Sequence, residues 1–159
     1  MAMTGVHDCF AKDHDRLDGH FAEFQNLKRT DFPTAKANFK QFMFGLKRHI
    51  VWEEEILFPI FERNTGMRDM GPTAVMRQEH VLIHQRLDAL HAKVRAADPE
   101  SDAEAEALLA VLKDHNMKEE QILYPAIDQM LAPGELEAVE KAMAGVPEPT
   151  CGCGHAHAH

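Results

Sequence analysis

The sequence predicts an all-α fold: an up-down-up-down antiparallel four-helix bundle with a short fifth C-terminal helix and a flexible tail. Apolar residues recur at steps of three and four through most of the chain, and the alternation that is typical of strands is nearly absent. Short breaks separate the helical stretches, and short connections favour antiparallel neighbours in a bundle. The length of 159 residues suits one domain with a core of its own.

Each element follows from its breakers and caps. Proline fits the first turn of a helix, so Pro33 and Pro72 mark the expected starts of the second and third helices. Ser101 and Glu104 have the spacing of a capping box, which predicts the start of the fourth helix. The expected helices cover 4–29, 33 to the loop at 64–72, 72–98, 101 to the break at 132–134, and 135–144.

Two prolines fall inside helical stretches, and the C-terminal end differs in composition from the rest. Pro59 and Pro125 each remove a backbone hydrogen bond, so each is expected to bend or end its helix. We expect one domain over 1–145 and a flexible tail over 146–159 that has little to bury. The tail contains Cys-x-Cys and three alternating histidines, a tract that either binds transition metals or is inert.

Composition excludes several classes of function. The 17 Lys and Arg residues against 26 Asp and Glu residues give a net charge of -9, which disfavours nucleic acid and anionic membranes as partners. The first residues lack the pattern of a signal peptide, and no stretch reaches the roughly 18 apolar residues that span a bilayer. The three cysteines form no disulfide framework. We therefore expect a cytoplasmic protein, and the sequence leaves a homo-oligomer open.

An internal repeat relates the two halves of the chain. HIVWEEEILFPI at 49–60 matches HNMKEEQILYPA at 115–126, and HDRLD at 14–18 aligns with HQRLD at 84–88. Two helix pairs of common design, packed together, would place matching residues opposite one another across a pseudo-twofold axis.

Seven polar side chains lie on helix stripes that are otherwise apolar. A spacing of four residues puts two side chains on one helix face, and burying so many imidazoles and carboxylates is costly unless something pairs with them. A single buried histidine is more often a satisfied core residue, but four helices that each present such groups favour a metal site. The expected metal ligands are His14, His49, Glu53, His80, His84, His115 and Glu119.

The donor set narrows the choice of metal. Imidazoles with only two carboxylates suit zinc, copper, iron or nickel, and argue against calcium or magnesium. Seven protein ligands are too many for one tetrahedral zinc, but they suit two six-coordinate irons that share bridging ligands. Ferritin-like di-iron sites use Glu-x-x-His and more carboxylates, whereas the histidines are in excess in this chain.

This ligand order resembles the hemerythrin-like, HHE cation-binding domains, over residues from about 7 to 130. The resemblance implies two Fe ions joined by an oxo or hydroxo bridge, and the spacing of His115 and Glu119 matches bacterial members. It also implies that dioxygen or a related small ligand binds at an open iron position. The implied division is His80, His84 and His115 on one iron, His14 and His49 on the other, and Glu53 and Glu119 as bridges.

The repeat suggests where the open position lies. When His14 is aligned with His84, Phe10 aligns with His80. An apolar ring then stands where a sixth imidazole would stand, so Phe10 is expected to line the open position. Gly45 lies one turn before His49. It either leaves space beside the iron with the open position or allows close helix packing.

Other polar residues near these stripes have weaker expectations. Asp18 and Asp88 follow aligned histidines by four residues, and they either accept the second N–H of a ligand imidazole or face solvent. Tyr124 is expected to be a core side chain. The expected non-ligand histidines are His7, His20 and His91.

The pattern favours a small-ligand binding protein over a catalyst. The main hypothesis is a di-iron protein that binds O2, or NO, reversibly for sensing, delivery or storage. The alternatives are an enzyme that consumes peroxide or NO, a repair factor for iron-sulfur centres, and an iron storage or trafficking protein.

Overall fold

The structure is a computed structural model that describes residues 3–148, and every regular element in that range is a helix. The prediction of an all-α bundle with a short C-terminal helix is confirmed. The predicted Cys/His tract begins at position 151 and lies outside the described residues. The elements are α1 (Val6–Leu27), α2 (Phe32–Trp52), η1 (Glu53–Leu57), α3 (Phe58–Thr65), α4 (Pro72–Arg95), α5 (Asp102–Lys118), η2 (Glu119–Leu123), α6 (Tyr124–Met130) and α7 (Glu135–Ala144).

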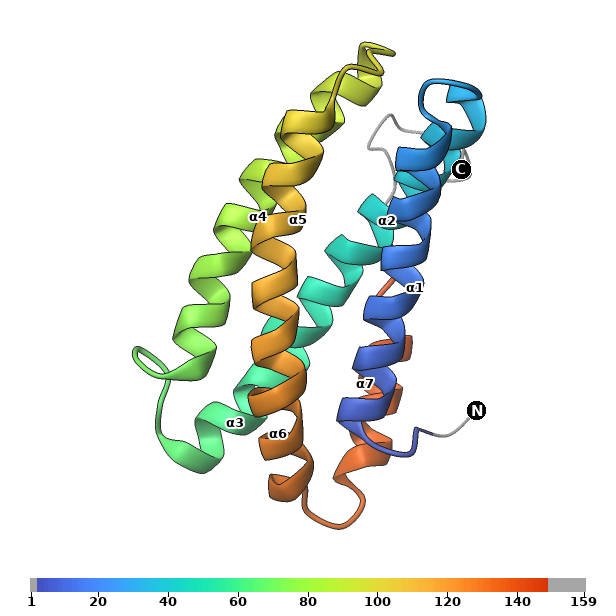
Figure 1. Cartoon of the computed structure of the whole chain (residues 1–159). Coiled ribbons are helices and arrows are strands. Elements are labelled where there is room, and N and C mark those ends of the chain that lie inside the picture. Colours follow the sequence, from blue (N-terminus) through green and yellow to red (C-terminus); the bar gives the residue numbers. More distant parts are fainter. Residues whose placement is uncertain (1–2, 149–159) are drawn as a thin grey trace.

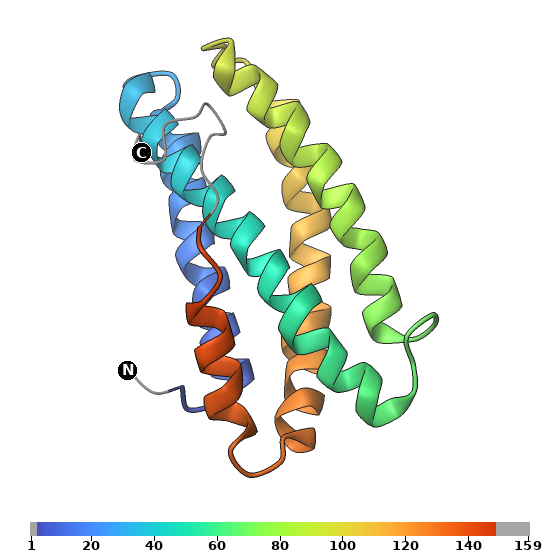
Figure 2. The same ribbon diagram turned by 180° about the vertical axis from the view of Figure 1, so that it is seen from behind.

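Four long helical runs form the bundle (Figure 1). The segments α2, η1 and α3 follow one another without a break, as do α5, η2 and α6, so each set makes one long helix with a π-helical turn inside it. α1 lies along α2, and α4 lies along α5, each as an antiparallel pair. Seen from behind in Figure 2, α7 lies on the outside of the first pair, where it packs against η1.

The start of α2 has a side-chain cap, whereas the start of α5 is held by a contact with α1. The Asp31 carboxylate accepts hydrogen bonds from the Thr34 backbone N–H at 3.3 Å and from its hydroxyl at 2.7 Å, which starts α2. Ser101 does stand at the N-cap of α5, but the capping-box contact is wrong because its side chain makes no cap hydrogen bond. Its hydroxyl instead accepts from Nζ of the buried Lys28 at 3.1 Å, which ties the end of α1 to the start of α5.

The sequence predicts that Pro59 and Pro125 either bend or end their helices. In the structure neither proline ends its helix. Each proline is the second residue after a π-helical turn, η1 or η2, and the helix continues beyond it. In the first half, the freed carbonyl oxygen of Glu54 accepts a hydrogen bond from Arg77 Nη2 at 3.2 Å. A π turn inside an α-helix is frequent at functional sites, and here Glu53 and Glu119 are the first residues of the two turns.

The core has two apolar clusters. One contains Leu17, Ile50, Ile83 and Leu112, and the other contains Phe10 with further side chains of η1, α4 and η2. Along each long helical run, a buried histidine or glutamate stands in sequence between members of these two clusters. The polar groups are therefore enclosed by apolar packing on both sides.

Candidate metal centre

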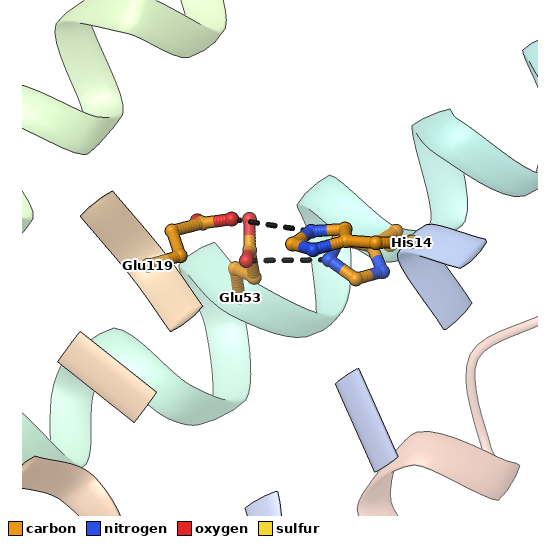
Figure 3. Close-up of side chains that lie close together, drawn as sticks. His14, Glu53 and Glu119 are labelled. Atoms are coloured by element: carbon orange, nitrogen blue, oxygen red, sulfur yellow. Dashed lines mark ion pairs between the residues drawn. The ribbon is translucent and has the colours of Figure 1, made fainter. Parts of the chain in front are cut away.

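Six buried side chains converge in the middle of the bundle. Each of the four long helical runs contributes one histidine, and the two π turns contribute the glutamates. Figure 3 shows His14, Glu53 and Glu119 pointing toward one another from three helical segments. In each of two groups the ligand atoms lie within 4.8 Å of one another: His14, His49, Glu53 and Glu119, and Glu53, His80, His115 and Glu119.

Both carboxylates span the two groups. Glu53 has one oxygen 3.3 Å from His49 Nε2 and the other 3.0 Å from His80 Nε2. Glu119 has one oxygen 3.3 Å from His14 Nε2 and the other 3.1 Å from His115 Nε2. Each glutamate therefore lies between an imidazole of the first helix pair and one of the second, as a bridging ligand does.

A second layer of four carboxylates orients the imidazoles. Each Nδ1 lies within hydrogen-bond distance of an Asp or Glu oxygen, which leaves each Nε2 facing the centre. Such outer carboxylates fix the ring orientation and raise the basicity of the ligating nitrogen. The pairs are His14 with Glu120 (2.7 Å), His49 with Asp13 (2.8 Å), His80 with Glu54 (2.6 Å) and His115 with Glu79 (2.9 Å).

The Tyr124 hydroxyl lies at the middle of the six groups. It donates to Glu53 and lies 2.9 Å from a Glu119 oxygen. The Nε2 atoms of His14 and His49 are 3.3 Å and 3.2 Å away. Tyr124 is fully buried, as expected of a core residue, but its oxygen belongs to the candidate centre.

The family model of the hemerythrin HHE cation binding domain matches residues 6–127, which include all six groups and the outer carboxylates. The chain belongs to the hemerythrin HHE cation-binding family. The resemblance that the ligand order predicts is thus confirmed.

Three relatives illustrate the range of the similarity. An uncharacterized hemerythrin-like protein of Schizosaccharomyces pombe is 30% identical over 134 residues, which are 84% of this chain and 64% of that protein. Iron-sulfur cluster repair proteins of Yersinia pestis and Yersinia pseudotuberculosis are 36% identical over 58 residues, 36% of this chain and 26% of theirs. The chain thus matches less than two thirds of the length of these relatives. No solved structure matches the chain.

Among the seven expected ligands of this hemerythrin-type domain, the structure brings six together and leaves His84 outside. His84 is half-buried, one turn beyond His80, and it belongs to neither group of ligand atoms. The equivalent pairs are His14 with His80 and His49 with His115, each 66 positions apart. The alignment of HDRLD with HQRLD uses a separation of 70 positions and is one helical turn out of register.

With a separation of 66 positions between the halves, Phe10 has a different equivalent residue. It is equivalent to Met76, not to a histidine, so no ligand is withheld there. Phe10 nevertheless lies against the centre, because its ring centroid is 5.1 Å from that of His49 and 5.3 Å from that of Tyr124. Each group of ligand atoms in the described structure contains two histidines, where the resemblance implies a division into three and two.

Gly45 serves helix packing in this structure. A Cβ atom there would lie 2.6 Å from Leu17 Cδ2 and 2.9 Å from an Arg16 guanidinium nitrogen. The glycine therefore lets α1 approach α2 closely, and the neighbours that it makes room for are not ligand atoms.

The four outer carboxylates are not among the site residues predicted from the sequence. They belong to Asp13, Glu54, Glu79 and Glu120. A signal exists in the sequence, since each of these acids is the immediate neighbour of a ligand residue. Asp18 and Asp88, the expected acceptors, make no hydrogen bond to a ligand imidazole in the described structure. Of the expected non-ligands, His20 Nδ1 bonds Asn38 and the His91 ring stacks on Phe39.

Without metal, the histidines of the centre form ion pairs with its glutamates. Burial opposes a charged His49, but Glu53 and Asp13 outweigh burial and raise its pKa to about 10. Burial likewise opposes a charged His80, while hydrogen bonds to Glu53 and Glu54 raise its pKa to about 9. Burial favours a neutral Glu53, yet the neighbouring histidines hold its pKa well below the ordinary value. Burial and the two glutamates raise the pKa of Tyr124 far above that of a free phenol.

The residues fit a pair of metal ions. Oε2 of the fully buried Glu119 has no hydrogen-bond partner among the described residues, although His115 Nε2 is 3.1 Å away. A buried carboxylate oxygen without a partner is costly, and a cation would satisfy it. Four imidazole nitrogens and two carboxylates that lie between the groups are a donor set that iron accepts.

None of the helices in residues 3–148 is both long and apolar enough to cross a lipid bilayer.

Proposed function

We propose that this chain is a non-haem di-iron protein that binds O2, or a related small ligand such as NO, reversibly. The observation that carries the proposal is the pair of carboxylates, each of which faces one imidazole from either helix pair. Two ions placed in the two groups would share both carboxylates. The proposed ligands are His14 and His49 for one iron, His80 and His115 for the other, and Glu53 and Glu119 for both.

Counting donors supports open coordination positions. Two imidazole nitrogens and one oxygen from each glutamate give each ion four protein donors. Iron in such sites commonly takes six ligands, so positions remain for a shared oxygen bridge and for a small exogenous ligand. Iron held there would supply the electrons and the open positions that such a ligand needs.

The surroundings control what reaches the centre. Phe10 and Phe58 lie against it, with the Phe58 ring centroid 5.7 Å from that of His80, and both side chains are fully buried. These apolar walls exclude bulk water and favour a small uncharged ligand. Tyr124 is the one hydroxyl at the centre of the described residues, and it can donate a hydrogen bond from Oη to whatever occupies the space between the groups.

A second candidate is an enzyme that consumes peroxide or NO, or a factor that repairs iron-sulfur centres. Tyr124 favours the catalytic version because a phenol beside the ligand groups can hold or deliver a proton. The similarity to iron-sulfur cluster repair proteins over 58 residues favours the repair version. Iron storage is a third version, which would involve the Cys/His tract beyond the described residues.

The accompanying proposals are a single domain over 1–145, a cytoplasmic location and no nucleic-acid partner. The continuous helical bundle supports one domain. The net charge of -9 supports the absence of a nucleic-acid partner.

The test is the optical spectrum of the reduced, iron-loaded protein before and after exposure to air. A coloured adduct that persists and is reversed by removing O2 supports the binding protein. Rapid loss of colour with turnover of added peroxide supports the enzyme and contradicts reversible binding.

Tyr124→Phe sharpens this test. The variant should keep its iron, because the phenol is not one of the six proposed ligands. If the phenol delivers a proton in catalysis, peroxide turnover falls by roughly 100-fold or more. Unchanged turnover would exclude the phenol from catalysis.

A further inference from the structure

A cavity of about 600 Å³ opens between α1 and the run from α5 to η2. Its walls combine apolar side chains such as Phe21 and Leu109 with the carboxylates of Asp15, Asp18 and Glu120. Glu120 is also the residue that holds His14 Nδ1 at 2.7 Å. A single imidazole therefore separates this cavity from the ligand groups of the centre.

Glu120 lacks the Lys or Arg partner that two of the other outer carboxylates have. Asp13 pairs with Arg16 at 3.0 Å, and Glu79 pairs with Lys118. Glu54 has Arg77 as a charged neighbour but forms no ion pair with it, and Glu120 forms no ion pair with Lys or Arg among residues 3–148. The ion-pair partner of Glu120 in this part of the chain is the imidazole of His14.

Two further carboxylates add to this charge. Asp15 and Asp18 line the same cavity, and neither forms an ion pair within the described part of the chain. Lys113 is the one lysine or arginine in the lining. Partial burial raises the pKa of Asp18, with a further rise from Asp15 and Glu120 that His14 opposes. The cavity therefore gathers three carboxylates, Asp15, Asp18 and Glu120, against a single lysine.

The other half of the molecule lacks this arrangement. At a separation of 66 positions, Asp15 corresponds to Val81 and Asp18 corresponds to His84. The lysine of the cavity is retained, since Lys113 corresponds to Lys47. The two carboxylates are thus specific to the side of the bundle where the cavity lies.

We propose that this cavity is the path by which a divalent metal ion, such as Fe²⁺, reaches the buried centre. Asp15 and Asp18 attract the hydrated cation, and Glu120 passes it beside His14 to the ligand groups. At the end of the path lies Glu119, with Oε1 3.3 Å from His14 Nε2 and with a buried Oε2 that has no hydrogen-bond partner among the described residues. This inference rests on the proposed metal centre and is independent of the gas that the centre binds.

The test is the rate of metal uptake by metal-free protein. Co²⁺ serves as the probe, because its absorption changes when it enters a site of nitrogen and oxygen ligands. The variant is the double substitution Asp15→Asn with Asp18→Asn, which leaves all six proposed ligands in place. Its control is Glu55→Gln with Asp88→Asn, two exposed residues that do not line the cavity, which changes the net charge equally.

The first variant should take up Co²⁺ roughly three- to tenfold more slowly than the parent, as expected when local electrostatic steering is removed. The control should match the parent, and all three proteins should reach the same final metal content. Equal uptake rates for the parent and the first variant, or equal slowing in the control, would overturn the path. A parent protein that binds no metal would contradict the metal centre itself.

Discussion

The first helix pair, α1 with the run from α2 to α3, and the second pair, α4 with the run from α5 to α6, place equivalent residues around one centre. The equivalent positions are 66 residues apart throughout. Each pair contributes two imidazoles, one glutamate that belongs to both groups and two outer carboxylates. Each pair also has a π turn that begins at its glutamate.

The surroundings of the two pairs differ at single positions. Tyr124 brings a hydroxyl to the centre where the first half has Phe58. α7 covers the first half beside Trp52, whose indole N–H donates to the Met143 carbonyl at 3.1 Å. The equivalent surface of the second half leaves Ile122 with 60% exposure.

This contrast separates two tasks. The part that repeats supplies the ligand groups and their orientation, which is what metal binding needs. The parts that do not repeat, namely Tyr124, the acidic cavity and the cover of α7, determine what approaches the centre and what can react there. Changes at repeated positions should therefore affect metal content, and changes at unrepeated positions should leave it intact.

The largest expected effect separates His80 from His84. His80→Ala removes an imidazole of the second group, so the iron content should fall from about two per chain to about one or fewer. His84→Ala is the matched control on the same helix, and it should retain about two irons. Elemental analysis of both variants tests this assignment, and loss of iron in His84→Ala would show that His84 is a ligand as well.

Removal of the metals should loosen the contact between the two pairs. Ligands that bind only the folded state stabilise it by about 3 kcal/mol when present at 100 times their dissociation constant. For a chain of this size the melting temperature of metal-free protein should be lower by roughly 6–12 °C. Differential scanning calorimetry of loaded and metal-free protein measures this, and equal melting curves would place the metal outside the core.

Alkaline pH should weaken the metal-free protein further. The pKa values of about 10 for His49 and about 9 for His80 lie above the ordinary 6.5, so protonation of these groups favours the folded state. Their contribution is complete below pH 6.5 and is lost as the pH rises through about 9 and 10. The melting temperature of metal-free protein should therefore fall between pH 6.5 and 10.

The iron-loaded protein is the control for this pH dependence. Its imidazoles bind metal in the neutral form, so the alkaline fall should be smaller there. A metal-free protein whose melting temperature is constant over the same pH range would show that the histidines carry no stabilising charge.

The smallest effect concerns Gly45, which has Val111 as its equivalent in the second half. Gly45→Ala places a methyl group 2.6 Å from the buried Leu17, so it should lower the free energy of unfolding by about 1–3 kcal/mol. Gly19→Ala is the matched control, since no atom lies within 4 Å of its added Cβ. It should be neutral or stabilising by up to about 1 kcal/mol. Urea denaturation measures both, and an unaffected Gly45→Ala would mean that α1 and α2 can separate without cost.

Much of the fold could be predicted from the sequence because helix periodicity and breakers are local signals. α7 begins at Glu135 and ends at Ala144, as expected from the break that precedes it. The two Glu-containing stretches were recognised as a repeat because they share six identities in register. The π turns were not foreseen, since the position of a widened turn depends on contacts between helices.

The site was less predictable where the choice lay between two residues one helical turn apart. His80 and His84 lie on similar faces of α4, and only the packing of α4 against η1 distinguishes them, with His80 held by Glu53 and Glu54. Tyr124 looked like a core residue because its ring is apolar and buried. Its role depends on where its hydroxyl ends, which periodicity does not specify.

The most direct test of the central claim is the metal content and Mössbauer spectrum of iron-loaded protein. The structure predicts about two irons per chain, coupled through shared bridges and similar in their ligands, because each group has two imidazoles and both glutamates. One iron or one zinc per chain after loading with excess iron would contradict the di-iron centre. Two uncoupled irons would contradict the bridging role of Glu53 and Glu119.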